Sequence, residues 1–401
     1  MLFTSTQNQK NLPRYFSRVF DMACNMNFGQ LDFALSDGRV FRAIGRNQGP
    51  IAQLNIHNPD IFARLIREGD LGFCDAYLDQ WWSTPDLQAF MDLIHADNDD
   101  LYDGFPGMAL VRFYEKFRFW LQRNSKKQAL KNISYHYDLG NDFYQLWLDE
   151  TMTYSSALFK TGQESLENAQ LAKYASMVEQ MDVQSGDHIL EIGCGWGGFA
   201  EYAAKEHGLR VTGLTLSNEQ LVFARERIEA LGLSDLVEFK LQDYRDETGQ
   251  YDGIASIEMF EAVGQKYWPS YFKILRDCLK PGRHATLQII TVQDARWDVY
   301  QRGVDFIQKY IFPGGMLPSP SVLRTEIETA GLNVVRSLEF GESYSQTLRR
   351  WHDVFNGKWD QVAALGFDER FRRMWNFYLT SCAATFSSSN CDVTQITVTN
   401  R

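Results

Sequence analysis

The sequence predicts an α/β fold in which a doubly wound, Rossmann-like parallel sheet follows a smaller N-terminal α+β domain. From residue 188 onward, short apolar strand candidates alternate with amphipathic helices, as in doubly wound sheets. Before residue 97, short strands and turns are followed by a helical stretch, as in a small α+β unit. The acidic segment 96–107, which contains Gly and Pro, separates the two patterns. We therefore predict one domain over residues 1–125 and a larger one over residues 126–401.

Each element is predicted from its own local pattern. The smaller domain has strands within residues 31–45 and helical periodicity over residues 58–82. The predicted strands of the larger domain are 188–193, 209–216, 237–243, 251–257 and 285–292, with helices at 197–208, 218–232 and 267–282, the last ended by Pro281 and Gly282. Residues 297–320 interrupt this alternation. Because ligands of such sheets bind beyond the carboxyl ends of the strands, we expect that insertion to line a substrate site.

Composition excludes several classes of function. The formal net charge of −11 argues against nucleic acid as a partner, since phosphate binding needs a surplus of Lys and Arg. The six cysteines are scattered, without a C-x-x-C pair or paired His residues, so we expect neither a disulfide framework nor a metal site. The N-terminus has no apolar signal region, and no run approaches the ~20 apolar residues that span a bilayer. We expect a cytoplasmic protein.

One local segment departs from the acidic average. Residues 110–131 read as a helix that carries seven basic residues, a single acid and interleaved aromatics. Such a helix can lie in the headgroup layer of an anionic membrane, which would make the protein peripherally membrane associated. The alternative is a solvated linker helix whose aromatics pack on the next domain. The sequence leaves both open.

The stretch LEIGCGWGG, residues 190–198, can be read as two different ligand loops. Its glycines match G-x-G-x-x-G of dinucleotide sites and E-x-G-x-G-x-G of S-adenosylmethionine (SAM) sites. A dinucleotide site needs an acid at the end of the second strand, where this chain has Thr215, Leu216 and Ser217. Acids instead stand before the glycines, at Glu191, and after the third strand, at Asp243. We therefore favour SAM over NAD, although Glu191 could also cap the following helix and Asp243 could close a turn.

Seven motifs in order make the resemblance specific. The chain resembles the cyclopropane-fatty-acyl-phospholipid synthases, a family that includes mycolic acid cyclopropane synthases, from about residue 130 to the C-terminus, and GDLGFCDAYLDQWW extends the similarity into the first domain. The motifs are YHYDLGNDFYQLWLDETMTYSSALF, LEIGCGWGG, GLTLSNEQ, LQDYRD, SIEMFEAVG, YIFPGGMLPS and YSQTLRRW. The resemblance implies a SAM-dependent methyltransferase that methylates double bonds of unsaturated phospholipid acyl chains to give cyclopropane fatty acids. It also implies a homodimer whose first domain helps with lipid capture or dimerisation.

The reaction that the resemblance implies requires close packing of the two reactants and then a base. A C=C bond needs no general base to attack a sulfonium methyl, and aromatic faces can stabilise the resulting carbocation. In the family, a bound bicarbonate held by Cys, Glu, His and Tyr is thought to take the proton that ring closure releases. The resemblance places the Glu at Glu261 and the Tyr at Tyr344. The Cys position holds Ser156 and the His position holds Gln288, and these departures put the product in doubt.

The resemblance also assigns the cofactor contacts. Tyr137 would hold the amino acid end of SAM, the glycines would form the loop, three residues after the second strand would surround the ribose, and Asp243 would reach the adenine. The predicted cofactor residues are Tyr137, Glu191, Gly193, Gly195, Gly197, Thr215, Leu216, Gln220 and Asp243. Three alternatives remain: an NAD oxidoreductase, a lipid-binding relative without turnover, and a relative that forms a methyl-branched alkene or desaturates a methylated chain.

Overall fold

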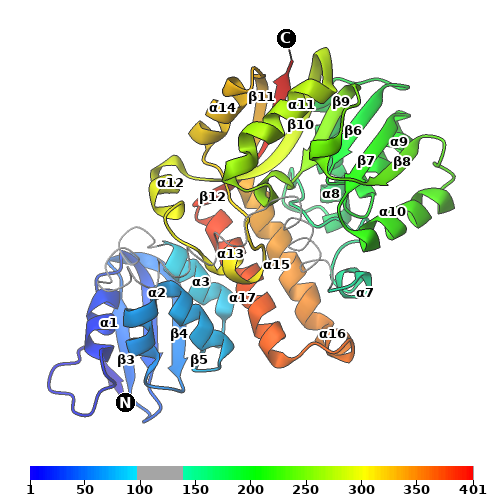
Figure 1. The fold of residues 1–401 in the computed structure, drawn as a ribbon. Helices are drawn as coiled ribbons and strands as arrows, with labels where there is room; N and C mark the ends of the chain where they lie inside the picture. Colours follow the sequence, from blue (N-terminus) through cyan, green and yellow to red (C-terminus); the bar gives the residue numbers. More distant parts are fainter. Residues whose placement is uncertain (97–138, 401) are drawn as a thin grey trace.

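The computed structural model describes residues 1–96 and 139–400 and contains two sheets (Figure 1). The N-terminal sheet has the order β1-β3-β2-β4-β5. Its strands are β1 (Leu2–Phe3), β2 (Phe28–Ala34), β3 (Val40–Ile44), β4 (Asn47–Ile56) and β5 (Trp82–Ser83). Helices α1 (Phe16–Ala23), α2 (Ile61–Leu78) and α3 (Leu87–Ala96) accompany it. This is the small α+β unit that the sequence predicts, and the predicted boundary after residue 125 lies outside the described residues.

The second sheet has the order β11-β12-β10-β9-β6-β7-β8. Its five parallel strands are β6 (His188–Ile192), β7 (Arg210–Thr215), β8 (Val237–Leu241), β9 (Tyr251–Ile257) and β10 (Leu279–Val292). Most residues of β6, β7 and β9 are buried, as expected where helices cover both faces of a parallel sheet. The strand order reverses at β6, so a ligand crevice is expected beyond its carboxyl end.

Helices connect and cover these strands. They are α8 (Leu166–Met181), α9 (Gly198–His207), α10 (Asn218–Ala230), α11 (Trp268–Cys278) and α14 (Pro320–Thr329), with the short α7 (Asn141–Gln145), α12 (Asp294–Tyr300) and α13 (Phe306–Tyr310) near the strand ends. Ser165 and Ser217 begin α8 and α10 with side-chain caps, each accepting a backbone N–H three residues on. The doubly wound prediction is therefore confirmed in its strands and in their order along the chain.

Two features differ from the sequence prediction. The helix predicted to end at Pro281 and Gly282 ends at Cys278, and β10 begins directly at Leu279 with an irregular register before His284. The antiparallel strands β11 (Asn333–Glu339) and β12 (Cys391–Thr399) were not predicted. β12 inserts between β10 and β11, a pairing across about a hundred residues that local sequence patterns do not reveal.

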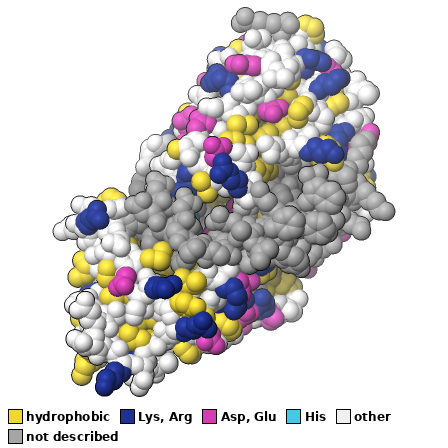
Figure 2. All heavy atoms as spheres, turned by 60° about the vertical axis from the view of Figure 1, so that its left-hand side comes forward, with side chains coloured by type: hydrophobic (Ala, Val, Ile, Leu, Met, Phe, Trp, Pro, Cys, Tyr) yellow, Lys and Arg dark blue, Asp and Glu magenta, His cyan; other side chains and the backbone are white. Residues whose placement is uncertain are grey.

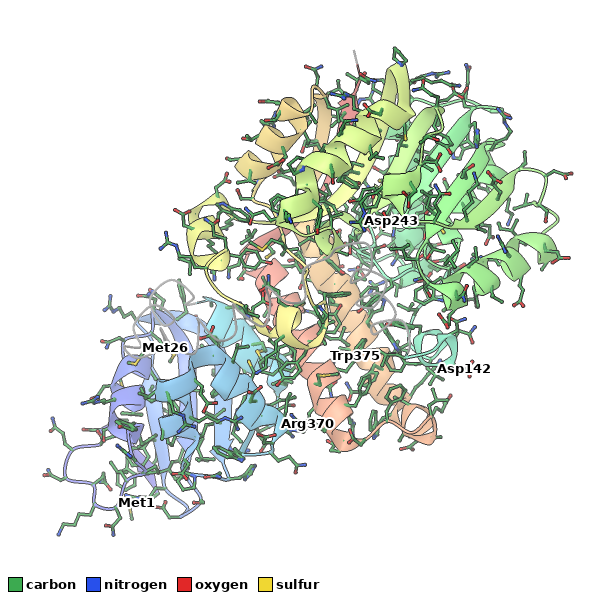
Figure 3. The ribbon with its side chains drawn as sticks, in the orientation of Figure 1. Met1, Met26, Asp142, Asp243, Arg370 and Trp375 are labelled. Carbon is green, nitrogen blue, oxygen red and sulfur yellow. The ribbon has the colours of Figure 1, made fainter. Side chains whose placement is uncertain are left out.

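The last helices join the two sheets. α15 (Gly341–Gly357) and α17 (Glu369–Ser387) pack together, with α16 (Trp359–Ala364) between them in sequence, and α17 also contacts α2 and α3 of the N-terminal domain. Figure 3 shows Arg370, near the start of α17, beside that domain. On the face seen in Figure 2, acidic and basic side chains are interspersed. No helix within residues 1–96 and 139–400 is long and apolar enough to cross a membrane.

Candidate active site

A cavity of about 890 Å³ lies beyond the carboxyl ends of β6, β7 and β9 and continues into the N-terminal domain. The glycine loop lines one end, and two half-buried glutamates after β9 line its middle. The N-terminal domain contributes mostly apolar side chains, among them Met26, Phe33, Phe62, Phe73 and Ile94. The cavity therefore combines a polar end in the larger domain with a long apolar extension.

The glycine loop exposes its backbone to this cavity. Gly193 and Gly195 line it and have φ values of +85° and +52°, which favour residues without a Cβ. A Cβ on Gly195 would have no protein atom within 4 Å, so it would point into open space. Gly197 does not line the cavity. A Cβ there would lie 3.1 Å from Ala224 Cβ, so this glycine permits α9 to pack closely against α10.

Glu191 is a buried acid that lines the cavity beside the loop. Its exposed fraction is 3%, and its Oε2 has no hydrogen-bond partner among the described residues. Burial raises the pKa of Glu191 well above its usual value. Because an unpaired buried carboxyl oxygen is costly, this position suits a ligand that supplies a donor. The alternative that Glu191 caps the following helix is not observed, since α9 has no side-chain cap.

Three further predicted residues lie together at the end of β7 and just after it. Thr215, Leu216 and Gln220 all line the cavity, and Thr215 Oγ1 donates to Gln220 Oε1 at 2.9 Å. The Ser217 cap fixes the start of α10 and so the position of Gln220. With Glu191 and the glycines, these residues form the end of the cavity that would hold SAM. The unpaired Glu191 oxygen and the open space at Gly195 fit such a ligand.

Two predicted cofactor residues, Asp243 and Tyr137, are not found among the described residues that line the cavity. Asp243 is not among the residues that line the cavity, although its neighbours Gln242 and Tyr244 are. Its carboxylate accepts the Arg245 backbone N–H and pairs with the Arg245 guanidinium, so the alternative role of closing a turn is observed. Figure 3 shows Asp243 near the ends of the parallel strands. Tyr137 lies outside the described residues, as does the basic helix of residues 110–131.

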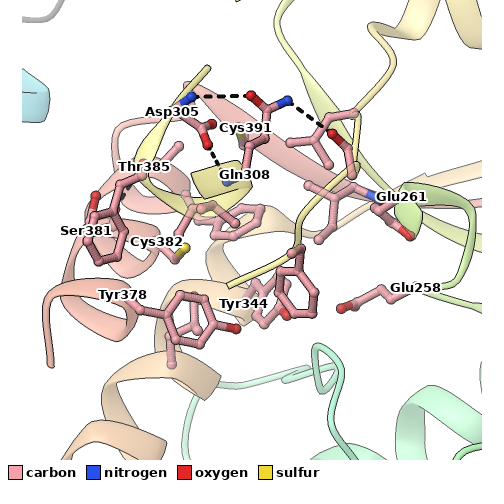
Figure 4. Close-up of a pocket in the computed structure, with 18 of the residues that line it drawn as sticks. Glu258, Glu261, Asp305, Gln308, Tyr344, Tyr378, Ser381, Cys382, Thr385 and Cys391 are labelled. Atoms are coloured by element: carbon pink, nitrogen blue, oxygen red, sulfur yellow. Dashed lines mark hydrogen bonds between the residues drawn. The ribbon is translucent and has the colours of Figure 1, made fainter. Parts of the chain in front are cut away.

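The middle of the cavity holds Glu258, Glu261 and Tyr344, which lie near one another in Figure 4. Glu261 Oε1 accepts the Ile290 backbone N–H at 2.6 Å, and its Oε2 has no hydrogen-bond partner among the described residues. Burial, and then the nearby Glu258 carboxylate, raise the pKa of Glu261 to about 8. Glu261 is therefore largely a neutral acid at neutral pH.

Glu258 is where the other predicted catalytic residues converge. Its Oε1 accepts the Ser156 backbone N–H and the Gln288 Nε2–H, each at 2.8 Å. Burial raises the Glu258 pKa, while Gln288, Ser156, Lys173 and Tyr344 each lower it. The structure thus brings Ser156, Gln288 and Tyr344 together, but around Glu258.

Ser156 and Gln288 are fully buried and do not line the cavity. The Ser156 hydroxyl donates to the Ala157 carbonyl oxygen at 2.9 Å. The Gln288 side chain also donates to the Ser156 carbonyl oxygen and accepts from Gln395. The Glu258 carboxylate is therefore supported by the Gln288 side chain and by the backbone N–H of Ser156, not by the Ser156 hydroxyl.

Lys173 on α8 is a buried amine next to this group. Its Nζ donates to Ser155 Oγ at 2.7 Å, and Ser155 lines the cavity. Burial lowers the Lys173 pKa to about 7, although Glu258, Asp149 and Glu191 oppose that shift. The lysine is therefore only partly charged at neutral pH, and its charged form is favoured by both acids of the cavity, Glu191 and Glu258.

Sequence reasoning missed Glu258 and Lys173. A signal for Glu258 existed, since Glu258 and Glu261 both follow the buried strand β9 at its carboxyl end, where ligands of such sheets bind. Lys173 gave no signal, because one lysine in a helix of mixed polarity reads as a solvated residue. Tyr154 and Phe312 are among the aromatic residues that line the cavity.

Comparison with known proteins identifies the family. A family model described as mycolic acid cyclopropane synthetase matches residues 124–396, which is more than half of the chain. The chain belongs to this family. It is a SAM-dependent methyltransferase, as the sequence resemblance predicts.

Two relatives align with this chain over most of its length. Tuberculostearic acid methyltransferase UfaA1 of Mycobacterium tuberculosis is 39% identical over 378 residues, which cover 92% of this chain and 87% of that protein. Cyclopropane-fatty-acyl-phospholipid synthase of Escherichia coli is 36% identical over 360 residues, covering 88% and 89%. Both alignments extend beyond the region that the family model matches.

Solved structures agree on the fold. The cyclopropane synthase MmaA2 from Mycobacterium tuberculosis superposes with a TM-score of 0.64 and 29% identity, over 67% of this chain and 98% of that one. Mycolic acid cyclopropane synthase CmaA1, solved with SAH and CTAB, gives 0.63 and 30% over the same shares. The predicted Rossmann-like fold and the predicted family are confirmed. The individual site residues stay predictions.

Proposed function

We propose that the protein transfers the methyl group of SAM to a double bond of an unsaturated phospholipid acyl chain and closes a cyclopropane ring. The observation that carries this proposal is the single continuous cavity. It runs from the glycine loop, past Glu258 and Glu261, to apolar side chains of the N-terminal domain. Such a cavity can hold a polar cofactor and a long apolar chain end to end. The E. coli relative, named for phospholipid cyclopropanation, supports the choice of substrate.

The residues divide the work along this cavity. When bound, SAM supplies an electrophilic methyl group. The SAM molecule is held at the polar end of the cavity by Glu191, Thr215 and Gln220. Buried apolar walls hold the acyl chain and exclude water, which would otherwise trap a carbocation. The rings of Tyr154 and Phe312, with centroids 6.4 Å apart, can stabilise that cation by about 2 kcal/mol when desolvated.

A bicarbonate ion does not fit the residues that the resemblance assigned to it. The Ser156 hydroxyl donates to a backbone carbonyl, and the Gln288 amide donates to Glu258 and to Ser156. Tyr344 interacts with the Glu258 carboxylate as well. Three of the four expected anchors are therefore already engaged, and we derive no step through bicarbonate.

We also propose that the protein works at the cytoplasmic face of a membrane as a homodimer. Its substrate is embedded in a bilayer, so the protein must approach the headgroup layer to take up an acyl chain. The basic, aromatic segment 110–131 supports this from sequence alone. The dimer rests on the family resemblance. Sedimentation of the purified protein at the mass of a monomer would refute it.

The enzymatic proposal is tested with purified protein, methyl-labelled SAM and vesicles of a monounsaturated phospholipid. Label should appear in the extracted lipid, and vesicles of the saturated counterpart should take up none. Absence of label from the unsaturated lipid would favour a lipid-binding relative without turnover. S-adenosylhomocysteine binding without NAD binding, measured by calorimetry, separates this proposal from the oxidoreductase alternative.

A further inference from the structure

We propose that the carboxylate of Glu258 is the proton acceptor of the reaction and takes the place of an external bicarbonate. This inference rests on the proposed function and names its base. It starts from the hydrogen bonds around Glu258. The Ser156 N–H and the Gln288 amide both donate to Oε1 at 2.8 Å, and Tyr344 interacts with the same group. Three residues that were expected to hold a bicarbonate ion therefore contact an anionic group of the chain itself, the Glu258 carboxylate.

The backbone at Glu258 is held in a conformation that glutamate rarely adopts. Its φ is +48°, in the left-handed region that favours glycine. A non-glycine residue there costs on the order of 1–3 kcal/mol and persists where the surrounding structure imposes it. Folding alone would be better served by glycine at this position. A glutamate that occupies this strained position, and that lines the cavity, is explained by the chemistry of its carboxylate.

The two neighbouring acids have different surroundings. Glu261 accepts one backbone N–H, and burial and then the Glu258 carboxylate raise its pKa to about 8. Burial raises the pKa of Glu258 as well, but the Gln288 and Ser156 donors, Lys173 and Tyr344 all oppose that shift. Donors aimed at a carboxylate oxygen favour its charged form. The two donors on Glu258 Oε1 therefore favour Glu258, rather than Glu261, as the proton acceptor of the pair.

The step balances without a further reactant. After methyl transfer the acyl chain carries a carbocation beside the carbon that bears the new methyl group. Glu258 accepts one proton from that methyl group, and the electron pair of the broken C–H bond forms the third bond of the ring. The products are a cyclopropane and a neutral Glu258 carboxyl. The carboxyl returns its proton to water when the lipid leaves and the cavity opens to solvent.

The experiment compares wild type, Glu258→Gly and Glu258→Gln in CO2-free buffer and in buffer with added bicarbonate. Glycine suits the positive φ, so the first variant should fold, and glutamine keeps the size of the side chain without a basic oxygen. Glu328→Gln, on the exposed side of α14, is the matched control. The readouts are cyclopropane formation from unsaturated vesicles and binding of S-adenosylhomocysteine.

Wild type and Glu328→Gln should be equally active with and without bicarbonate. Both Glu258 variants should lose at least about 100-fold in ring formation in CO2-free buffer while they still bind the cofactor product. Added bicarbonate should restore part of the activity of Glu258→Gly, because its anchors then face an empty site. Label uptake that depends on bicarbonate in wild type, or full activity of Glu258→Gly without it, would overturn this assignment alone. No label in lipid from wild type would overturn the proposed function as well.

Discussion

At the scale of single residues, a substitution at Gly195 tests whether the glycine loop binds the cofactor. Its missing Cβ faces open space in the cavity, so Gly195→Val should place a branched side chain where the ligand lies. We expect calorimetry to show loss of S-adenosylhomocysteine binding. Gly232→Val is a matched control, since Gly232 also has a positive φ, of +69°, and nothing within 4 Å, but does not line the cavity. Equal affinity in the two variants would contradict the assignment of the loop.

Glu261 gives a prediction about pH. Its pKa rises from 4.5 to about 8 on folding. Between these values the folded protein keeps a proton that the unfolded chain loses, so stability falls as pH rises, by about 1.4 kcal/mol per pH unit for this group. Glutamine does not ionise, so Glu261→Gln removes this fall in stability with pH. Urea unfolding at about pH 5 and about pH 8 should therefore show the variant gaining stability relative to wild type as pH increases.

The Glu261 prediction has its own control. Glu328→Gln makes the same chemical change on an exposed side chain, so its difference from wild type should not change with pH. A constant difference between Glu261→Gln and wild type over the same range would mean that Glu261 is already ionised in the folded protein.

Single residues were predictable where a motif carried them. Glu191, Gly193, Gly195, Thr215, Leu216 and Gln220 were predicted, and all line the cavity. Glu258 was missed because its significance depends on a left-handed backbone and on three long-range partners. Ser156 and Gln288 were predicted to hold an anion directly, but spacing along the chain cannot show that they support a neighbouring carboxylate instead.

At the scale of elements, α17 docks the N-terminal domain onto the larger one. Arg373 donates to the carbonyl oxygens of Tyr77 and Trp82 at 2.7 and 2.9 Å, and its guanidinium lies 3.8 Å from the centre of the Tyr77 ring. Arg373→Ala should therefore lower the free energy of unfolding by about 2–3 kcal/mol, measured by urea titration.

Arg370, one turn earlier, is the control for that prediction. It pairs with Asp79, but its side chain is 51% exposed, so Arg370→Ala should cost about 0–1 kcal/mol. Equal losses in the two variants would mean that Arg373 does not anchor the interface.

The predictability of elements follows the range of their contacts. The parallel strands β6 to β10 alternate with helices in sequence order, so local periodicity identified them. β12 pairs with β10 and β11 although α15 and α17 separate it from both in sequence, so local patterns do not reveal its partners. Early termination of α11 at Cys278 was missed because β10 starts without an intervening loop.

At the scale of the whole molecule, the membrane proposal predicts a salt-dependent association. Neutralising Lys116, Arg118, Arg123 and Lys127 should weaken flotation with anionic phospholipid vesicles, since each charge contributes ~1 kcal/mol near such a surface. Neutral vesicles should show little difference between wild type and variant. Equal flotation with anionic vesicles at low salt would leave segment 110–131 as a linker.

The shared cavity was not predictable from either domain alone. For the first domain, lipid capture was expected only from the family resemblance. In the structure its apolar side chains extend the cavity that begins at the glycine loop. Such an extension forms where the apolar cores of two domains come into contact. The spacing of residues within one domain does not reveal which surface of the other domain it will contact.

Ring closure is the central claim, and the fate of the transferred hydrogens tests it most directly. Purified protein is supplied with SAM that carries a trideuterated methyl group and with vesicles of a monounsaturated phospholipid, and the acyl chains are analysed by mass spectrometry. Closure of the ring must remove one deuterium from the methyl group, so we predict a product that retains two. A methyl-branched alkene, formed when a proton leaves the chain instead, retains all three deuteriums. Full retention in the methylated lipid would contradict the account.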